Sequence, residues 1–465
     1  MEPADKSLPS RGTLERLTAA LEHGLIERRS QIRLMLLAAL AGEHTLLIGL
    51  PGTAKSELAR RLHLAFRDAR YFERLLTRFS VPEELFGPLS IAALEQDRYE
   101  RQTAGFLPEA GIAFIDEVFK ANSAILNALL TLLNERKFDN GAGRMACPLI
   151  SVVGATNEVP EDEVGEAFFD RFLLRLPVVP VSGVAFGRLL DLDDLPAPPD
   201  FMPLDGDDLA GIAAAARAVA LLPEVAGLLA ELRQQQETAG VYVSDRRWVK
   251  IARLLKVAAA TEGRREVCLW DLWLLPWCAA PDASGQQAVA DWLASRLGVR
   301  TACSPPRLTR VVEAFEAQTR LEHEADDLDY DEDGRLKFSA ELETRVTDAK
   351  GAAEGLRMGF HKQRRYGASH IRARLGQIND LVARLDGYRQ ELADYQTSLA
   401  AYRAHSLWLD PDFAERAGAN LTAVGDVLAI LRVRLLAARA QFEALPRLPT
   451  DPGTVPEPVA YETLE

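Results

Sequence analysis

The chain has 465 residues, of which 48% are hydrophobic and 26% are charged, and its formal net charge is −14. The length predicts about two to four domains. The acidic balance gives no general attraction to nucleic-acid phosphates, so nucleic acid is not expected as a partner. The four cysteines lack metal-site spacing, and we recognise neither a signal peptide nor an apolar run of membrane-spanning length. These features predict a cytoplasmic protein.

The N-terminal part alternates short apolar segments with helical patterns. Residues 13–42 are predicted to form one or two helices. The predicted strands that follow are 45–49, a weaker one near 72–78, 112–116, 149–155 and 172–177. Strands that alternate with helices predict an α/β fold, a parallel sheet with helices on both faces. The Pro-rich stretch at 195–199 ends this domain, which we assign to residues 1–195.

The remainder of the chain is predicted to be mostly helical, beginning with a helical domain over 205–300. Apolar side chains then recur at spacings of three and four over 371–402 and again over 421–442, which predicts two long helices. We therefore expect a helical arm over 307–445, either an antiparallel hairpin or a bundle. Its apolar seam serves either internal packing or the docking of a partner. The tail, 446–465, is rich in proline and acidic residues and is predicted to be disordered.

Residues 49–56, with the sequence Gly-Leu-Pro-Gly-Thr-Ala-Lys-Ser, lie between a predicted strand and a predicted helix. This order is typical of a phosphate-binding loop, in which backbone N–H groups surround the phosphates, a lysine contacts the β/γ-phosphates and a hydroxyl binds Mg²⁺. Ala54 occupies the position of the usual last glycine, and the loop closes around it if φ is negative there. The predicted phosphate-binding residues are Gly49, Pro51, Gly52, Thr53, Ala54, Lys55 and Ser56.

Polar side chains end two further predicted strands. Asp116 and Glu117 follow an apolar run, and buried strands rarely end in paired carboxylates without a partner for the charge. Asp116 is placed to hold Mg²⁺ together with Ser56, and Glu117 to polarise the attacking water as a general base. Asn157 ends the next strand, where it is expected to orient that water against the γ-phosphate.

In this order, the loop, the Asp116–Glu117 pair and Asn157 resemble an AAA+ ATPase. The segments TRFSVPEELFGPLS at 77–90 and AILNALLTLLNER at 124–136 are similar to the MoxR branch and, within it, to the RavA subfamily. The resemblance covers roughly residues 10 to 300. It implies an AAA+ core with a helical lid, ATP and Mg²⁺ as ligands, a homo-oligomer in the form of a hexameric ring, and a ViaA-like von Willebrand factor A protein as partner.

The resemblance also implies site residues that the local sequence alone does not identify. Arg171 matches the arginine finger that reaches the γ-phosphate of a neighbouring subunit. Arg246 matches the sensor-2 arginine of the lid, with its neighbour Arg247 as the alternative. Leu25 and Ile26, ahead of the core, are assigned to the nucleotide-binding set.

Two loops match family features that do mechanical work. Residues 88–106 resemble the helix-2 insertion, and residues 137–148 resemble the hairpin before sensor 1, with an Asn-Gly pair that favours a tight turn. Both loops either face the pore or upper surface of a ring or are passive surface hairpins. Beyond about residue 330 the family pattern fails, because no run of alternating strand residues is present to build the β-rich module that binds a lysine decarboxylase in RavA-type proteins.

The sequence therefore predicts a MoxR/RavA-type ATPase that remodels or matures protein complexes together with a von Willebrand factor A partner. One alternative is an activating ATPase similar to the rubisco-activase-like or chelatase-subunit enzymes, which would not need the long helical arm. Another is a nucleic-acid motor, which would need a basic and aromatic pore surface, whereas the candidate loop tips are mixed or acidic. A nucleotide-gated binding module without turnover is a third alternative, and the intact Glu117 argues against it.

Overall fold

The fold was analysed in a computed structural model, which describes residues 8–141, 143–160, 163–191, 197–300, 303–325 and 364–461. The chain divides into two compact units. The first contains residues up to Leu297 together with Ala401–Arg416, and the second contains Gly298–Ala400 and the residues from Ala417 onward. Within the described ranges, no helix has the length and apolar character needed to cross a membrane.

A five-stranded sheet forms the centre of the first unit, and all of its strand pairs are parallel. The order is β2-β3-β6-β1-β7, with the bounds β1 His44–Ile48, β2 Tyr71–Leu75, β3 Ile112–Asp116, β6 Ser151–Thr156 and β7 Phe172–Pro177. The predicted α/β fold with a parallel sheet is confirmed. Since parallel strands have their carboxyl ends at one edge, the segments after β1, β3 and β6 lie together there.

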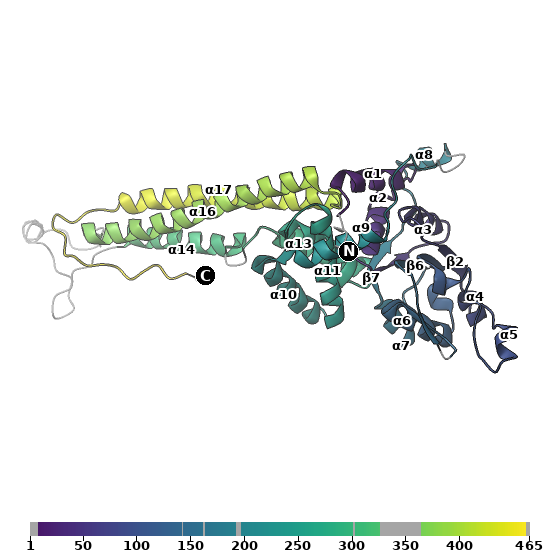
Figure 1. The fold of residues 1–465 in the computed structure, drawn as a ribbon. Helices are drawn as coiled ribbons and strands as arrows, with labels where there is room; N and C mark the ends of the chain where they lie inside the picture. Colours follow the sequence, from purple (N-terminus) through teal and green to yellow (C-terminus); the bar gives the residue numbers. More distant parts are fainter. Residues whose placement is uncertain are drawn as a thin grey trace, which may run out of the picture. The chain divides into compact units, whose positions relative to one another are not determined.

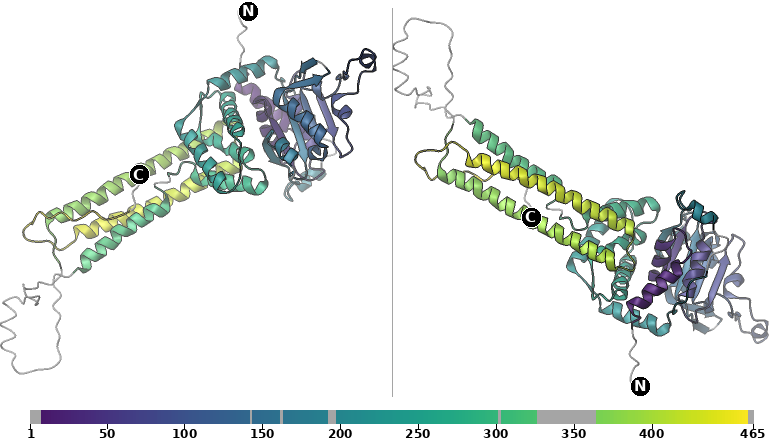
Figure 2. Two further views of the ribbon diagram at one scale, coloured as in Figure 1. Left: turned by 90° about the horizontal axis from the view of Figure 1, so that it is seen from below. Right: turned by 90° about the horizontal axis from the view of Figure 1, so that it is seen from above.

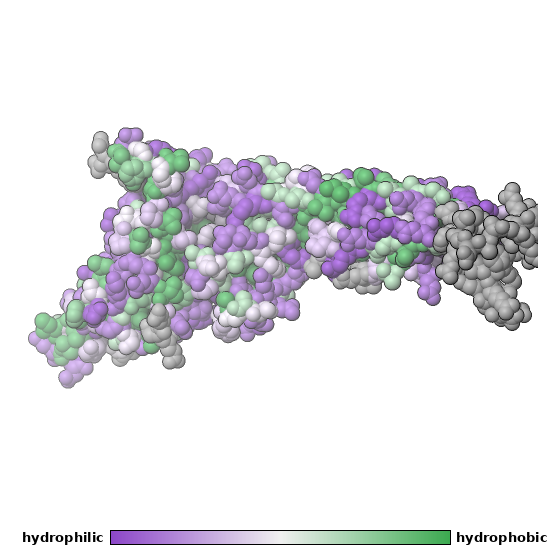
Figure 3. Space-filling view, turned by 180° about the vertical axis from the view of Figure 1, so that it is seen from behind, coloured by the Kyte–Doolittle hydropathy of each residue, from purple (hydrophilic) through white to green (hydrophobic). Residues whose placement is uncertain are grey.

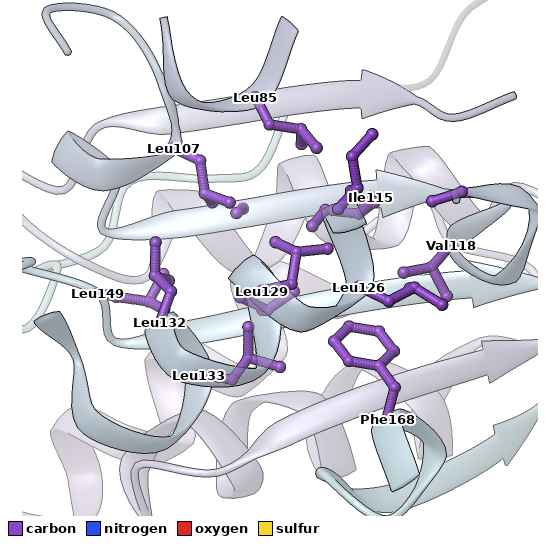
Figure 4. Packing of buried hydrophobic residues seen from close by; sticks show 14 of the residues in the cluster. Leu85, Leu107, Ile115, Val118, Leu126, Leu129, Leu132, Leu133, Leu149 and Phe168 are labelled. Atoms are coloured by element: carbon purple, nitrogen blue, oxygen red, sulfur yellow. The ribbon is translucent and has the colours of Figure 1, made fainter. Parts of the chain in front are cut away.

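Helices cover both faces of this sheet (Figure 1). On one face lie α1 (Arg11–Glu22), α2 (Arg29–Leu40) and α3 (Lys55–Leu64), and on the other lie α6 (Ser123–Glu135) and α7 (Glu163–Phe169). Figure 4 shows how α6 packs, with Leu126, Leu129 and Leu133 pointing toward the strands. Apolar residues recur on α6 at helical spacing, so one side of the helix is buried against β3 and β6.

The two predicted loops are joined to each other. The first contains α4 (Pro82–Phe86) and α5 (Ile91–Leu94), and the second is the hairpin β4 (Lys137–Asn140) and β5 (Gly143–Ala146). The Asn140 side chain accepts a hydrogen bond from the Arg101 amide at 2.6 Å and donates to the Arg101 carbonyl at 3.1 Å. A Cβ at Gly141 would lie 2.3 Å from the Tyr99 carbonyl oxygen. The loops therefore pack as one element.

A helical lid follows the sheet domain, after the short helix α8 (Phe186–Leu190). Its elements are α9 (Gly206–Ala218), β8 (Ala220–Leu221), α10 (Pro223–Thr238), α11 (Asp245–Thr261), β9 (Glu266–Val267), the 3₁₀-helices at Leu269–Leu274, α12 (Leu275–Ala279) and α13 (Ala283–Arg296). Trp270 and Trp273 are buried in its core. The lid belongs to the same compact unit as the sheet, and Lys250 of α11 forms an ion pair of 2.6 Å with Glu43 ahead of β1.

Three helices build the second unit, α14 (Pro305–Glu324), α16 (Ala368–His405) and α17 (Pro411–Glu443), and they lie side by side in both views of Figure 2. The two long helices are the predicted antiparallel hairpin. Most of the predicted seam is buried, including Ile378, Leu385, Leu421 and Leu428. Ion pairs join the helices in all three combinations, Arg374–Glu322 at 2.8 Å, Arg434–Glu316 at 2.7 Å and Arg432–Asp386 at 2.8 Å.

The C-terminal tail differs from its prediction. Although its composition suggests disorder, the described residues 446–461 follow the helical hairpin in an extended conformation. The amide of Leu448 donates to the Tyr366 carbonyl at 2.9 Å, and the Glu457 carbonyl accepts a hydrogen bond from Arg374 at 2.7 Å. Val459 is buried. The side chains of Arg374 and Gln377 on α16 thus bond the Glu457 carbonyl and the Val459 amide, so this part of the tail is held without a partner strand.

The turn between the two long helices belongs to the first unit. Its Trp408 indole donates a buried hydrogen bond of 2.9 Å to the Thr261 hydroxyl at the end of α11. The amide of Leu407 and the hydroxyl of Ser406 both donate to the Glu262 carboxylate. On the opposite side of the turn, Ser30 of α2 donates to the Asp410 carboxylate at 2.8 Å. The turn thus contacts both the lid and a helix of the sheet domain.

Candidate nucleotide-binding site

The loop at 49–56 follows the carboxyl end of β1 and leads into α3, as predicted. Gly49 is required by its close contact with the neighbouring strand, because a Cβ there would lie 2.1 Å from the Val178 carbonyl oxygen. The amide of Gly49 donates to the Thr156 carbonyl at 3.0 Å, which fixes the start of the loop to β6. The Thr53 hydroxyl donates to the Leu50 carbonyl at 2.9 Å and closes the curl.

Ala54 corrects one expectation. A negative φ was expected there for the loop to close, but Ala54 has φ +66° and ψ 28°, in the left-handed region. A side chain with a Cβ adopts this conformation at a cost of about 1–2 kcal/mol. Ala54 is the N-cap of α3, and its carbonyl accepts the first helical hydrogen bond, from Leu58 at 3.1 Å. The loop therefore keeps the glycine-like conformation although the residue is alanine.

Lys55 is buried within its own loop. Its ammonium group donates to the carbonyl oxygens of Gly49 at 2.6 Å and Leu50 at 2.9 Å, and its distance to Asn157 Oδ1 is 3.5 Å. Burial lowers the pKa of Lys55, and the carboxylates of Asp116 and Glu117 oppose that shift. The lysine is thus held beside both carboxylates at the carboxyl edge of the sheet.

The three polar residues predicted from strand ends come together. Asn157 donates from Nδ2 to Glu117 Oε1 at 2.7 Å, and the Glu117 amide donates to Asp116 Oδ1 at 3.0 Å. Glu117 has φ +52°, so the chain turns sharply after β3 and directs its carboxylate toward β6. The ammonium group of Lys120 lies 3.2 Å from Glu117 Oε2. Lys55, Asn157, Glu117 and Lys120 form one continuous polar chain.

Two basic residues close to the phosphate loop and to Glu117, Arg28 and Lys120, were not predicted from the sequence. Arg28 is buried, and its guanidinium donates to the Thr53 carbonyl at 3.3 Å and to the Val179 carbonyl at 2.7 Å. Burial lowers its pKa. Leu25 and Ile26, predicted to contact the nucleotide, lie three and two residues before Arg28, respectively, in the segment that precedes α2. The spacing of three residues between Glu117 and Lys120 is the signal that could have identified this ion pair from the sequence.

The predicted arginine finger lies at the other edge of the sheet. Arg171 directly precedes the amino end of β7, and its guanidinium is 3.7 Å from the Asp170 carboxylate. Its side chain is 18% exposed, and its Nε is buried without a hydrogen-bond partner in the described part of the chain. A strand of this length spans about 17 Å, which is longer than an arginine side chain. The structure therefore does not bring Arg171 to the phosphate loop of its own chain.

The two sensor-2 candidates have different environments. Arg247 is buried, donates to the carbonyls of Phe172 at 3.0 Å and Leu173 at 2.7 Å, and holds α11 against β7. Arg246 is exposed, and its guanidinium is 3.5 Å from Asn134 Oδ1 at the end of α6. Arg246 lines a cavity of about 580 Å³ together with Glu43 and His44, at the amino edge of the sheet. It thus lies, like Arg171, away from the loop of its own chain.

Comparisons with known proteins identify relatives of the sheet domain and of the lid. Residues 12–192 match the family described as the MoxR domain in the MoxR-vWA-beta-propeller ternary systems, and residues 224–293 match an AAA lid domain. Two uncharacterised proteins of Methanocaldococcus jannaschii are 42% and 41% identical over 264 residues, which cover 56% of this chain and 68% and 70% of theirs. A crystal structure of a Cytophaga hutchinsonii protein covers 58% of this chain and 86% of its own, with 18% identity and a TM-score of 0.48.

The parallel sheet, the loop after β1 and the lid define an AAA ATPase domain followed by an AAA lid. The chain belongs to the MoxR family of AAA ATPases. Membership in this family implies that the nucleotide is ATP. The finer assignment to the RavA subfamily and the roles of the individual residues go beyond these matches.

Proposed function

We propose that this chain is a MoxR/RavA-type ATPase that hydrolyses ATP within a hexameric ring and remodels protein complexes together with a von Willebrand factor A partner. The observation that carries the proposal is the polar chain at the carboxyl edge of the sheet. It joins Lys55 to Asn157 at 3.5 Å and Asn157 to Glu117 at 2.7 Å. A phosphate-binding lysine, a water-orienting amide and a general base are the side chains that phosphoryl transfer to water requires.

Each of these side chains has a distinct proposed role. Lys55 exchanges its contacts with the carbonyls of Gly49 and Leu50 for contacts with the β/γ-phosphates, a change that keeps its charge partnered. Glu117 accepts a proton from the attacking water, and Asn157 fixes the direction of that water. Before ATP and water bind, Asn157 contacts Oε1 of Glu117 and Lys120 contacts Oε2, so the orientation of the carboxylate is fixed.

Mg²⁺ fits the oxygen donors present. Ser56 offers a hydroxyl at the start of α3 and Asp116 a carboxylate at the end of β3. No group of three or more metal-binding side chains occurs among the residues that the structure describes. Mg²⁺ usually binds through one or two protein oxygens plus water and substrate phosphates, so this sparse donor set suits it. The ion supplies charge neutralisation for the phosphate oxygens.

The positions of Arg171 and Arg246 support assembly into a ring. Both side chains lie at the amino edge of the sheet, whereas the phosphate loop lies at the carboxyl edge of the same chain. An arginine that cannot reach its own nucleotide can serve the nucleotide of the next subunit in a head-to-tail ring. ATP hydrolysis then depends on assembly, and sixfold closure is the arrangement that the resemblance implies.

An apolar surface around α8 also supports assembly. After β7 the chain exposes Val184, Phe186, Leu189 and Leu190 around α8, and Val184 is 97% exposed. Figure 3 shows hydrophobic residues gathered at this corner of the molecule. A second subunit that packs on this side of the sheet domain would cover these side chains.

The partner assignment rests on the family. The matching family is the MoxR domain of ternary systems that combine MoxR, vWA and β-propeller components. We propose that this chain likewise acts with a vWA protein and a β-propeller protein. A nucleic-acid role has less support, because the tip of the 88–106 loop is mixed in charge, with Asp97 and Glu100 beside Arg98 and Tyr99. The joined loops are better suited to contact protein.

A mixing experiment tests the shared site. Lys55→Ala and Arg171→Ala proteins are each expected to lose ATPase activity. In an equimolar mixture that exchanges subunits, about one interface in four combines an intact loop with an intact arginine, so about a quarter of wild-type activity should return. If the mixture stays inactive while both variants still form rings, Arg171 does not act on a neighbour.

A second experiment tests the partner. Glu117→Gln protein should bind ATP without hydrolysing it and retain its partners on the ring. Pull-down from the native host with ATP should recover a von Willebrand factor A protein, and the Lys55→Ala variant, which cannot bind ATP, is the matched control. Equal recovery with both variants, or no such protein with either, contradicts the proposed nucleotide-dependent partnership.

A further inference from the structure

A second cluster of charged side chains lies at the amino edge of the sheet, apart from the polar chain at the phosphate loop. Its centre is Arg175 in the middle of β7. The residue is only 6% exposed, and its guanidinium packs on the Phe169 ring with 3.9 Å between the guanidinium carbon and the ring centroid. Nη2 donates to the Phe169 carbonyl at 3.4 Å, a long contact, and Nε is buried without a partner in the described residues.

The charges around Arg175 do not balance. Arg247 lies nearby with its guanidinium fully engaged by main-chain carbonyls, and Arg171 pairs with the same carboxylate as Arg247 does. That carboxylate is Asp170, which lies 3.3 Å from Arg247 and 3.7 Å from Arg171. Asp170 is therefore shared by two guanidinium groups, and among the described residues Arg175 has no carboxylate of its own. Burial and the positive charge of Arg247 lower the pKa of Arg175 well below its ordinary value.

A cavity adjoins this cluster. Its volume is about 260 Å³, and it is lined by Arg175, Arg247 and Asp170, by residues 240–243 ahead of α11, and by Ala279 and Pro281. A cavity needs only about 10–15 Å³ in this measure to hold one water molecule, so this one has room for a polyatomic ion with water. Its charged lining consists of two guanidinium groups, those of Arg175 and Arg247, and one carboxylate, that of Asp170.

Guanidinium groups bind phosphate and carboxylate oxygens through paired N–H donors, and a buried guanidinium without such a partner destabilises the folded protein. A neutral ligand would leave the positive charge uncompensated. We propose that this cavity, the Arg175 pocket, binds a small phosphoryl oxyanion, either inorganic phosphate or the phosphate of a nucleotide, with Arg175 as its principal ligand. The proposal does not depend on ATP hydrolysis by the chain.

The test measures binding in a chain whose phosphate loop is disabled. In full-length Lys55→Ala protein, equilibrium dialysis with labelled inorganic phosphate should show one site per chain, and phosphate should raise the melting temperature relative to chloride at equal ionic strength. ADP is compared in a parallel series. Phosphate binding identifies the free ion as the ligand, and binding of ADP alone identifies a nucleotide phosphate.

Matched variants in the same background assign the site. Arg175→Met fills the same volume without charge, so it should be at least as stable in chloride and should lose the phosphate-dependent rise in melting temperature. Arg175→Lys keeps the charge but not the paired donors, and should weaken phosphate binding about tenfold. If the methionine variant does not fold, the lysine variant alone tests whether Arg175 binds the oxyanion. If neither oxyanion binds the parent protein, or if both variants bind as well as the parent, the inference is wrong.

Discussion

The left-handed conformation of Ala54 leads to a quantitative prediction. Ala54→Gly should stabilise the first unit rather than destabilise it. At φ +66° the alanine is strained by about 1–2 kcal/mol, and glycine removes this strain. Glycine also makes the unfolded chain more flexible, which costs about 0.4–1 kcal/mol. Since Ala54 is exposed, no buried methyl contact is lost, and the net gain should be about 0.5–1 kcal/mol.

The matched control is Ala214→Gly, at an exposed position in the middle of α9. There the conformation is helical, so glycine should destabilise the fold by about 1 kcal/mol. Urea unfolding followed by circular dichroism measures both changes, and hydrogen exchange of the α3 amides reports on the loop itself. The two variants should therefore differ by about 1.5–2 kcal/mol with opposite signs. Equal losses of stability in both would refute the assigned strain.

Three further predictions follow from the same unit. Gly49→Ala places a Cβ 2.1 Å from the Val178 carbonyl oxygen just after β7, so stability should fall by about 1–3 kcal/mol in thermal unfolding and ADP binding should be lost in calorimetry. Gly227→Ala, in α10 of the lid, where a Cβ would meet no atom within 4 Å, should retain binding. Trp408→Phe removes the buried bond to Thr261 and should destabilise the first unit by about 1–2 kcal/mol in scanning calorimetry; no change would show that the turn is not held there. Burial lowers the pKa of His44 from 6.5 to about 3, so the unfolded chain binds the extra proton and stability should fall as the pH drops from 6.5, by about 1.4 kcal/mol per pH unit. His44→Asn should reduce this slope in unfolding experiments between pH 6.5 and 5, and an unchanged slope would contradict the prediction.

The parts of the site that were predicted are those that the chain fixes locally. The loop at 49–56, Asp116, Glu117 and Asn157 each end or follow a strand with a clear apolar pattern, and parallel pairing alone brings the ends of such strands together. The heptad-like spacing in the two long helices was equally local. The fold class and the first set of side chains could therefore be predicted without tertiary information.

The parts that were not predicted depend on partners distant in sequence. The sign of φ at Ala54 follows from anchors such as Gly49 against Val178, and not from the preference of alanine itself. Arg28 and Lys120 have long side chains whose targets become known only after folding. The tail was expected to be disordered from its composition, but the helical hairpin supplies the hydrogen bonds that its own sequence cannot.

The turn between α16 and α17 is hydrogen-bonded to a helix that begins next to the phosphate loop. Ser30 and Arg33 of α2 bind Asp410 and the Leu407 carbonyl, and α2 begins next to Arg28, which contacts the phosphate loop at Thr53. The same turn contacts the end of α11 in the lid. Within the first unit, one short segment of the chain therefore bridges the lid and the helix whose start contacts the phosphate loop. A movement of the lid away from the core would have to break either the hydrogen bond of Trp408 or that of Asp410.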